Sequence, residues 1–380
     1  MYVVEWASRV SWLIVLCALV LMGWGYGCIV RGDELVGDGT LAARQAIWIA
    51  VSVPVMWGAT LIPYHIFRRF SYLFYAVCLV LLSIACLMPP VNGSRAWIPL
   101  GFMNLQPSEM AKIAFIMTLA HYLMYRQNYR RWSGLIVPFL LTIVPVLLIL
   151  KEPDLGSALL FFPVLFAMLF AAGARPRHLV LISLMGLTSL PVIWWQMNAE
   201  QRSRIIAVFL QEDGGEVPKG SLYHLHQSKQ VLALGGTWGS RWGGMPSDDP
   251  LAYHLPASRT DFVFCLLGER FGFWGCGAVM AFYLVLFAKG LRIAAQTREP
   301  FGRLLAVGIV SLLAAQTIVN LGMTVGLMPI TGITLPLMSY GGSSLLATCF
   351  ALGLLIKVHM RPGYDVCPEP FRFGSKMASA

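Results

Sequence analysis

Residues 133–150 read Ser-Gly-Leu-Ile-Val-Pro-Phe-Leu-Leu-Thr-Ile-Val-Pro-Val-Leu-Leu-Ile-Leu, a run without a single charged side chain. About 20 apolar residues in a helix are enough to cross a hydrocarbon core of roughly 30 Å. Because backbone amides and carbonyls find no water in that core, a spanning segment must satisfy its hydrogen bonds within one helix. The run therefore predicts a transmembrane helix.

Similar apolar runs recur along almost the whole chain. Of its 380 residues, 57% are hydrophobic and 12% are charged, whereas soluble domains carry about 25% charged residues. We therefore expect an all-α, polytopic membrane protein of about ten transmembrane helices, with residues 1–380 forming one integral membrane domain. The expected spans are Ser11–Val30, Gln45–Tyr64, Ser71–Met88, Pro107–Tyr125, Ser133–Leu150, Gly156–Gly173, His178–Trp195, Phe262–Lys289, Arg303–Leu327 and Ser343–His359.

Basic residues gather in the connections between alternate spans. Lys and Arg in such connections mark the cytoplasmic side, so both termini, including a tail at 361–380, are expected on the cytoplasmic side of the inner membrane. The long connection 196–260 is then extracytoplasmic, and a loop of this length is usually functional or disordered. We expect a functional loop. The basic clusters are Arg68 with Arg69, Arg126 with Arg130 and Arg131, Arg175 with Arg177, Lys289 with Arg292, Arg298 and Arg303, and Lys357 with Arg361.

Charge and cysteine patterns exclude several classes of function. The net charge of +10 lies in these short clusters, which encode topology, so we expect no nucleic-acid partner. The 8 cysteines lack the spacing of a zinc site. No Gly-Lys pair occurs in the chain, and a phosphate-binding loop of the Walker type requires one. ATP-driven transport is therefore disfavoured.

Glu109 and Lys112 lie three residues apart inside an apolar run, and this spacing places them on one face of a helix. A charge within a membrane costs several kcal/mol unless it is paired or hydrated. The two residues are therefore expected either to form a structural ion pair or to line a polar cavity, and the sequence leaves both readings open.

Two aspartates stand where helices are expected to begin. Asp154 follows a proline and is placed to cap the next helix, although a carboxylate there could also meet a substrate or a cation. Ser258 and Asp261 have the spacing of a capping box before the next span. Because Asp261 also lies where the long connection meets the bundle, it is equally placed to reach a lipid head group.

Glycine and hydroxyl residues fill the segment 333–344 between the last two expected spans. Gly341 and Gly342 permit unusual backbone angles, and Ser343 is placed to cap the last helix. Free amides at a helix start favour anions such as phosphate. The segment, which includes Ser339, is thus either an ordinary turn or an anion-binding site.

Four blocks resemble, in order and spacing, the signatures of the SEDS family (shape, elongation, division and sporulation), which includes the RodA, FtsW and SpoVE proteins. The resemblance extends from the first span to about His359. It implies a peptidoglycan glycosyltransferase that polymerises lipid II, the undecaprenyl-pyrophosphate-linked disaccharide peptide, beside a class B penicillin-binding protein. The blocks are Asn92-Gly-Ser-Arg95 with Gln106-Pro-Ser-Glu109, Glu152-Pro-Asp-Leu-Gly156, Leu255-Pro-Ala-Ser-Arg-Thr-Asp-Phe262, and Pro336 through Ser344.

The resemblance also implies roles for single residues. Asp261 falls on the family's essential loop aspartate, which implies the catalytic base of an inverting transfer with lipid pyrophosphate as the leaving group. A divalent cation, Mg²⁺ or Mn²⁺, is an open expectation, and its ligands are not implied. The residues implied to bind substrate or line the cavity are Glu109, Lys112, Arg95, Asp154, Gln227, Lys229, Arg259, Ser339, Gly341, Gly342 and Ser343.

Two branches of the family remain in competition. Gln227-Ser-Lys229 and the short termini favour the RodA type, which acts in cell-wall elongation and cell shape, and this is our prediction. Ile333-Thr-Leu-Pro336 is more similar to the FtsW type, which acts at the septum during cell division. A flippase or transporter of the lipid-linked precursor is a further alternative, in which Glu109, Lys112 and Glu269 would mark a path through the membrane.

Overall fold

The computed structural model describes residues 9–36, 39–89, 95–99, 101, 104–125, 132–210, 221–243, 255 and 257–360. The tail 361–380 and parts of the connection 196–260 lie outside the described residues. The helices are α2 (Trp12–Val36), α3 (Thr40–Leu61), α4 (Tyr64–Arg69), α5 (Ser71–Ala85), α6 (Pro107–Met124), η2 (Trp132–Leu135), α7 (Ile136–Lys151), α8 (Leu155–Ala172), α9 (Pro176–Gln196), α10 (Ala199–Phe209), α11 (Ser221–Leu234), α12 (Ser240–Gly243), α13 (Val263–Gln296), α14 (Pro300–Thr324) and α15 (Gly342–Met360).

Every expected span coincides with one of these helices, which confirms an all-α, polytopic membrane protein. Among the described residues, 7 helices are long and apolar enough to cross a membrane by length and composition: α2, α3, η2 with α7, α8, α13, α14 and α15. Helix α5 is apolar but shorter. Helices α6 and α9 carry charged or histidine residues, which lower their hydropathy without preventing a helix.

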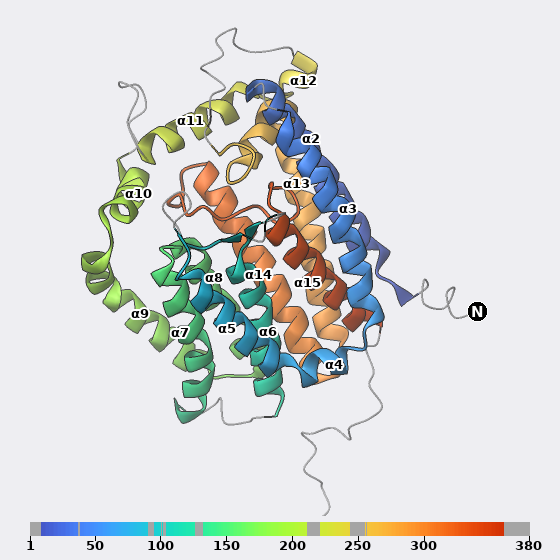
Figure 1. The fold of residues 1–380 in the computed structure, drawn as a ribbon, viewed down its shortest axis with the longest axis vertical. Coiled ribbons are helices and arrows are strands. Elements are labelled where there is room, and N and C mark those ends of the chain that lie inside the picture. Colours follow the sequence, from blue (N-terminus) through green and yellow to red (C-terminus); the bar gives the residue numbers. More distant parts are fainter. Residues whose placement is uncertain are drawn as a thin grey trace, which may run out of the picture.

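Helix α14 is central to the bundle, where it packs against α6, α8, α13 and α15. Helix α3 packs on α15, and α2 packs on α13. Figure 1 shows α2, α3, α13 and α15 gathered on one side, with α5 to α8 on the other. Buried leucine, isoleucine and phenylalanine side chains from both groups join in one continuous core, so the two sides pack against each other.

The connection 196–260, expected to be a loop, is helical over much of its described length. Helices α9, α10 and α11 run along one side of the molecule in an arc that leads to α12 (Figure 1). Ser228 ties α11 to the end of α14, because its hydroxyl donates to the carbonyl of Thr324 at 3.2 Å. The prediction of a loop was incomplete for two reasons: α11 packs against α13, and α10 has a local capping box, in which the amide of Asn198 donates to Gln201 Oε1 at 3.2 Å.

Helix α13 is interrupted at Gly272, where φ is 63°. This backbone conformation favours glycine, and a Cβ here would overlap the backbone of Thr237 and Gly239. The interruption docks the segment between α11 and α12 against α13. It also divides a helix of 34 residues, which is longer than one membrane crossing requires.

A short hairpin precedes α6. Its strands, β1 (Ile98–Pro99) and β2 (Asn104–Leu105), pair antiparallel with Ile98 opposite Leu105. The hairpin brings the chain to the start of α6 at the same end of the bundle where α15 begins, because Ser343 Oγ donates to the carbonyl of Asn104 at 3.1 Å.

Candidate active site

The starts of α6, α8, α13 and α15 lie around the segment 331–341, which is the later part of the connection from α14 to α15. Gly156, in the first turn of α8, touches this segment so closely that a Cβ would overlap the carbonyl of Thr331. Ser343 of α15 accepts a hydrogen bond from the backbone amide of Gln106 at 3.2 Å. Helix starts expose free amides and carry partial positive charge, so this end of the bundle is suited to an anionic ligand.

Asp261 does not belong to a capping box, contrary to one of the sequence readings. The residue before α13 is Phe262, and no side chain caps the helix. Instead, Ala257 adopts a φ of 54°, and its carbonyl accepts hydrogen bonds from the amides of Thr260, Asp261 and Phe262 at 3.1, 3.1 and 3.3 Å. This tight turn moves the helix start past Ser258 and leaves the Asp261 carboxylate without a capping role.

Asn320 holds this turn in place, and the sequence analysis missed it. Its Nδ2 donates to the carbonyl of Asp261 at 2.8 Å and to the carbonyl of Ile333 at 2.7 Å. The side chain is completely buried in α14. One amide therefore fixes the backbone of Asp261 against the segment 331–341. The available signal was an asparagine in a mostly apolar span, because a buried amide requires a hydrogen-bond partner.

The electrostatic environment of Asp261 favours a proton acceptor near neutral pH. Burial raises its pKa to about 6, the negative charge of Asp154 acts in the same direction, and Arg204 and a hydrogen bond from Thr260 oppose the shift. A base is most useful when its pKa is close to the working pH. Arg204, on α10, is a second residue near this carboxylate that the sequence analysis did not single out.

Asp154 caps α8 as predicted, because its Oδ1 accepts a hydrogen bond from the amide of Ser157 at 3.0 Å. Its neighbour Glu152 is completely buried. Burial and the charge of Asp154 raise the pKa of Glu152 to about 8. The block Glu152-Pro-Asp154 thus places one capping carboxylate beside an acid that holds its proton at neutral pH.

The glycine and hydroxyl segment is folded back on the turn of Asp261. The amide of Tyr340 donates to the carbonyl of Arg259 at 3.0 Å, and Ser339 Oγ accepts from the amide of Leu335 at 2.8 Å. Gly341 and Gly342 remain partly exposed at the start of α15. Ser343 does not cap α15, since the helix begins at Gly342 and the Ser343 hydroxyl is used by the hairpin instead.

Two ion pairs connect α2 with the segment that carries Asp261. Arg259 Nη1 lies 2.7 Å from Asp33 Oδ1, and Arg31 Nη2 lies 3.0 Å from Glu269 Oε1. Glu269 is completely buried, and its charge is paired with Arg31, as the cost of a charge in lipid requires. Arg259 is therefore engaged with the protein in this structure.

Glu109 and Lys112 form a buried ion pair in the first turns of α6, with 2.8 Å between Lys112 Nζ and Glu109 Oε1. The side chains are only 8% and 3% exposed, respectively. Each charge thus compensates the other in the first turns of α6. The geometry supports the structural reading and leaves the cavity-lining reading as a proposal.

Three of the implied substrate residues have less direct positions. Arg95 is exposed before the hairpin, where Nη1 lies 3.5 Å from the carbonyl of Cys86. Gln227 is buried and Lys229 half-buried on α11.

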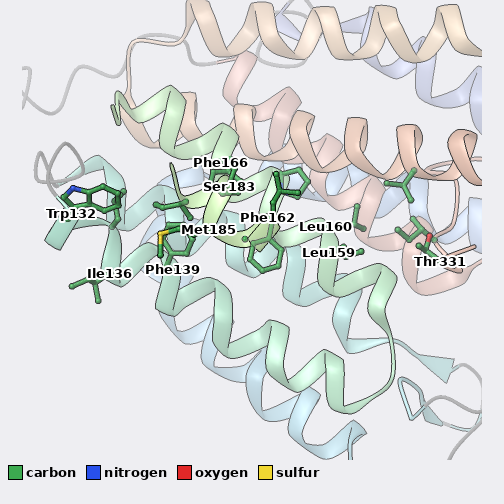
Figure 2. Close-up of a pocket in the computed structure, with 17 residues that line it drawn as sticks. Trp132, Ile136, Phe139, Leu159, Leu160, Phe162, Phe166, Ser183, Met185 and Thr331 are labelled. Atoms are coloured by element: carbon green, nitrogen blue, oxygen red, sulfur yellow. The ribbon is translucent and has the colours of Figure 1, made fainter. Parts of the chain in front are cut away.

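An apolar groove of about 1020 Å³ lies between α7, α8 and α9, and it ends at the segment 331–333. Figure 2 shows Trp132 and Ile136 at one end, Phe139, Phe162 and Phe166 along its length, and Thr331 at the other end. Thr331 and Ile333 line the groove, while Ile333 shares the amide of Asn320 with Asp261. Gly332, between Thr331 and Ile333, lies next to the Asp261 carboxylate, since a Cβ on it would lie 3.7 Å from Oδ2. The apolar groove therefore ends beside the candidate catalytic carboxylate.

Comparison with known proteins gives this arrangement a family. The family model FTSW_RODA_SPOVE, described as "Cell cycle protein", matches residues 9–363. The chain belongs to this family. The SEDS resemblance of the sequence blocks is thereby confirmed over nearly the entire chain.

Individual members agree with this membership. The chain is 34% identical over 367 residues to a probable peptidoglycan glycosyltransferase FtsW of Geobacter sulfurreducens, which covers 93% of this chain and 96% of the relative. A solved structure of a peptidoglycan synthase complex, described as coordinating polymerization and crosslinking, contains a chain of 30% identity with a TM-score of 0.78, covering 94% and 99% of the two chains.

A variant of the Thermus thermophilus rod shape determining protein RodA has the same fold. Its TM-score is 0.70 at 29% identity, with 94% of this chain and 99% of that chain covered. A relative named FtsW and a solved structure named RodA are thus both similar to this chain.

Proposed function

We propose that this chain, an enzyme of a peptidoglycan glycosyltransferase family, polymerises lipid II into glycan strands at the outer face of the inner membrane. The observation that carries the proposal is the apolar groove of about 1020 Å³ that ends at Thr331 and Ile333, beside Asp261. A polyprenyl chain lying in this groove would bring its pyrophosphate and first sugar to the carboxylate. The substrate and the site then have matching apolar and polar ends.

In this reaction Asp261 acts as the general base. The acceptor sugar hydroxyl attacks the anomeric carbon of the donor and gives its proton to the Asp261 carboxylate. The bond from the anomeric carbon to the lipid pyrophosphate breaks, and the pyrophosphate leaves with the electron pair. A single displacement inverts the anomeric centre and requires one base but no carboxylate nucleophile.

The leaving pyrophosphate needs positive charge or hydrogen-bond donors. The partly exposed backbone at Gly341 and Gly342 begins α15, and helix starts bind phosphate groups. Arg204 supplies the positive charge that acts on Asp261. Arg259 is the weaker candidate, because it is paired with Asp33, and Arg95 remains a candidate only through its motif.

The described residues supply only some of the ligands that a divalent cation needs. Among the described residues, no group of three His, Cys, Asp or Glu side chains could hold a metal ion. Mg²⁺ is commonly bound by one or two carboxylates together with substrate phosphates, and Asp154 and Asp261 are the carboxylates that would hold it. The cation would neutralise charge on the pyrophosphate.

We place the site on the extracytoplasmic side with both termini in the cytoplasm, as the basic clusters favour. The similar chain in a peptidoglycan synthase complex supports a class B penicillin-binding protein as partner.

For the branch of the family, we propose a RodA-type role in cell-wall elongation. The FtsW-type septal role is equally compatible with the similarity to FtsW. The catalytic groups gather at one end of the bundle, which favours polymerisation over transport.

The decisive experiment measures polymerisation of lipid II by purified protein. Positioned bases typically contribute about 10²–10⁴-fold to rate, so Asp261→Asn is expected to lower the rate by at least about 10²-fold with an unchanged melting temperature. Glu34→Gln is the matched control, because Glu34 is an exposed carboxylate near the same end of the bundle. Equal rates in wild type and Asp261→Asn would remove Asp261 as the base.

A further inference from the structure

A second cavity, of about 260 Å³, lies at the opposite end of the bundle from Asp261. Its walls come from the last residues of α6, the last residues of α8 and the start of α14. They are Leu123, Met124, Ala171, Ala172, Arg298, Pro300, Arg303 and Leu304. The cavity thus combines two arginines with an otherwise apolar lining, where helices enter and leave the membrane.

The two arginines flank the start of α14. Both are exposed, and Arg303 Nη2 donates to the carbonyl of Ala171 at 2.9 Å, at the end of α8. This bond holds the Arg303 guanidinium over the cavity wall. A guanidinium has five donors in a planar fork that matches phosphate, so further donors remain for a ligand.

The acid that follows Arg298 in sequence has other partners. Glu299 lies between Arg298 and Pro300 in sequence, but its side chain is 9% exposed or less and turns inward. Its Oε2 accepts the hydrogen bond of the Gly302 amide at 2.5 Å, and its Oε1 lies 3.6 Å from Arg68 Nη1. The cavity therefore keeps a positive character.

We propose that this cavity binds the head group of an anionic phospholipid, with the phosphodiester between Arg298 and Arg303 and the acyl chains along the exposed face of α8, which includes Phe170. Basic pockets between helices at the cytoplasmic boundary are suited to such head groups. A free phosphate would satisfy the arginines but would leave the apolar walls against water. A volume of about 260 Å³ also exceeds by far the roughly 30 Å³ of one water molecule, as a head group requires.

The test uses the purified full chain in neutral detergent, titrated with dioleoyl phosphatidylglycerol, with dioleoyl phosphatidylcholine or with inorganic phosphate. Binding is followed by the rise in melting temperature and by native mass spectrometry. We expect phosphatidylglycerol to bind and stabilise the wild type, and the other two to have little effect. About 1 kcal/mol per basic residue near an anionic surface corresponds to an affinity about 30-fold weaker in Arg298→Gln/Arg303→Gln.

Matched variants separate charge at this cavity from charge in general. Arg69→Gln/Arg292→Gln removes the same charge from two exposed arginines that do not line the cavity, and it should bind phosphatidylglycerol like the wild type. Arg298→Gln alone changes one exposed side chain, should fold normally, and is expected to weaken binding about 5-fold. Arg298→Lys/Arg303→Lys should retain most of the affinity.

Three results would overturn the proposal. Equal affinity of the cavity variants and the Arg69/Arg292 control would show that the charges act without a defined site. Stabilisation by phosphatidylcholine to the same extent would show that the lining binds any lipid. Stabilisation by inorganic phosphate alone would assign the arginines to a soluble anion.

Discussion

At the scale of the residue, the buried side-chain amide of Asn320 links the two parts of the candidate site. Asn320 joins the backbone of Asp261 to that of Ile333 through two hydrogen bonds. The Ile333 side of this link belongs to the end of the apolar groove. Asn320, near the end of α14, thus links the backbone of the proposed base to the segment where the proposed substrate would end.

We predict that Asn320→Ala lowers the turnover number of lipid II polymerisation by about 10²-fold with little change in KM, because a displacement of about 1 Å at a reacting group can cost that much. Asn320 acts as a positioning residue, so the split between turnover number and KM is the readout. Gln316→Ala is the matched control, since Gln316 is a buried amide one turn earlier in α14. Equal turnover in the two variants would contradict the prediction.

The pKa of Asp261 gives a prediction for pH dependence. The base works as a carboxylate, and its pKa is raised to about 6, so the rate should be constant above pH 7 and fall about tenfold per pH unit well below pH 6. The measurement is the initial polymerisation rate from pH 4.5 to 8, with the melting temperature followed in parallel. A rate that stays flat down to pH 5 would indicate a carboxylate with an ordinary pKa, close to 3.8.

At the scale of the element, helix α6 shows how a membrane helix accommodates charge. Its Glu109 and Lys112 lie on one face and pair at 2.8 Å, while the rest of its buried surface is mainly apolar. The charged pair lies in the first turns, next to the hairpin and the start of α15. Because the two charges pair with each other, α6 buries them as a unit that is neutral as a whole.

We predict that Glu109→Gln and Lys112→Met each destabilise the protein, because each leaves one buried charge without its partner, a change that typically costs 3–5 kcal/mol. The double variant should be milder than the sum of the two. A double-mutant cycle in melting temperature and in polymerisation rate measures this coupling. Strictly additive effects would show that the two charges do not stabilise each other.

At the scale of the whole molecule, charge is distributed between two ends. The end that carries Asp154, Asp261 and the start of α15 holds the candidate active site. The other end carries the arginines of the second cavity and the pair between Arg68 and Glu299. The orientation proposed from the basic clusters assigns the first end to the outer face and the second to the cytoplasm.

Cysteine labelling tests this orientation in intact cells. Trp238→Cys places a thiol at an exposed position between α11 and α12, and it should react with an impermeant maleimide without permeabilisation. Arg69→Cys places a thiol at the exposed end of α4, and it should react only after permeabilisation. The reverse pattern would invert the topology and move Asp261 to the cytoplasm.

The sequence by itself determined the class of the fold and much of the site. Apolar runs specify helices because lipid leaves a backbone no other partner, and every expected span is a helix in the structure. The pairing of Glu109 with Lys112 and the cap by Asp154 follow from spacing of three residues, which a helix converts into contact. The family blocks pointed to Asp261.

Only the tertiary structure decided which residues surround Asp261. Asn320 is 59 positions away in sequence, and Asp33 lies 226 positions from Arg259, so no local pattern could announce either contact. The predicted caps at Ser258 and Ser343 failed because the turn at Ala257 and the hairpin at Asn104 compete for the same groups. Local spacing determines which caps and side-chain pairs a helix can form. Packing between segments distant in sequence determines which of these contacts form in the folded chain.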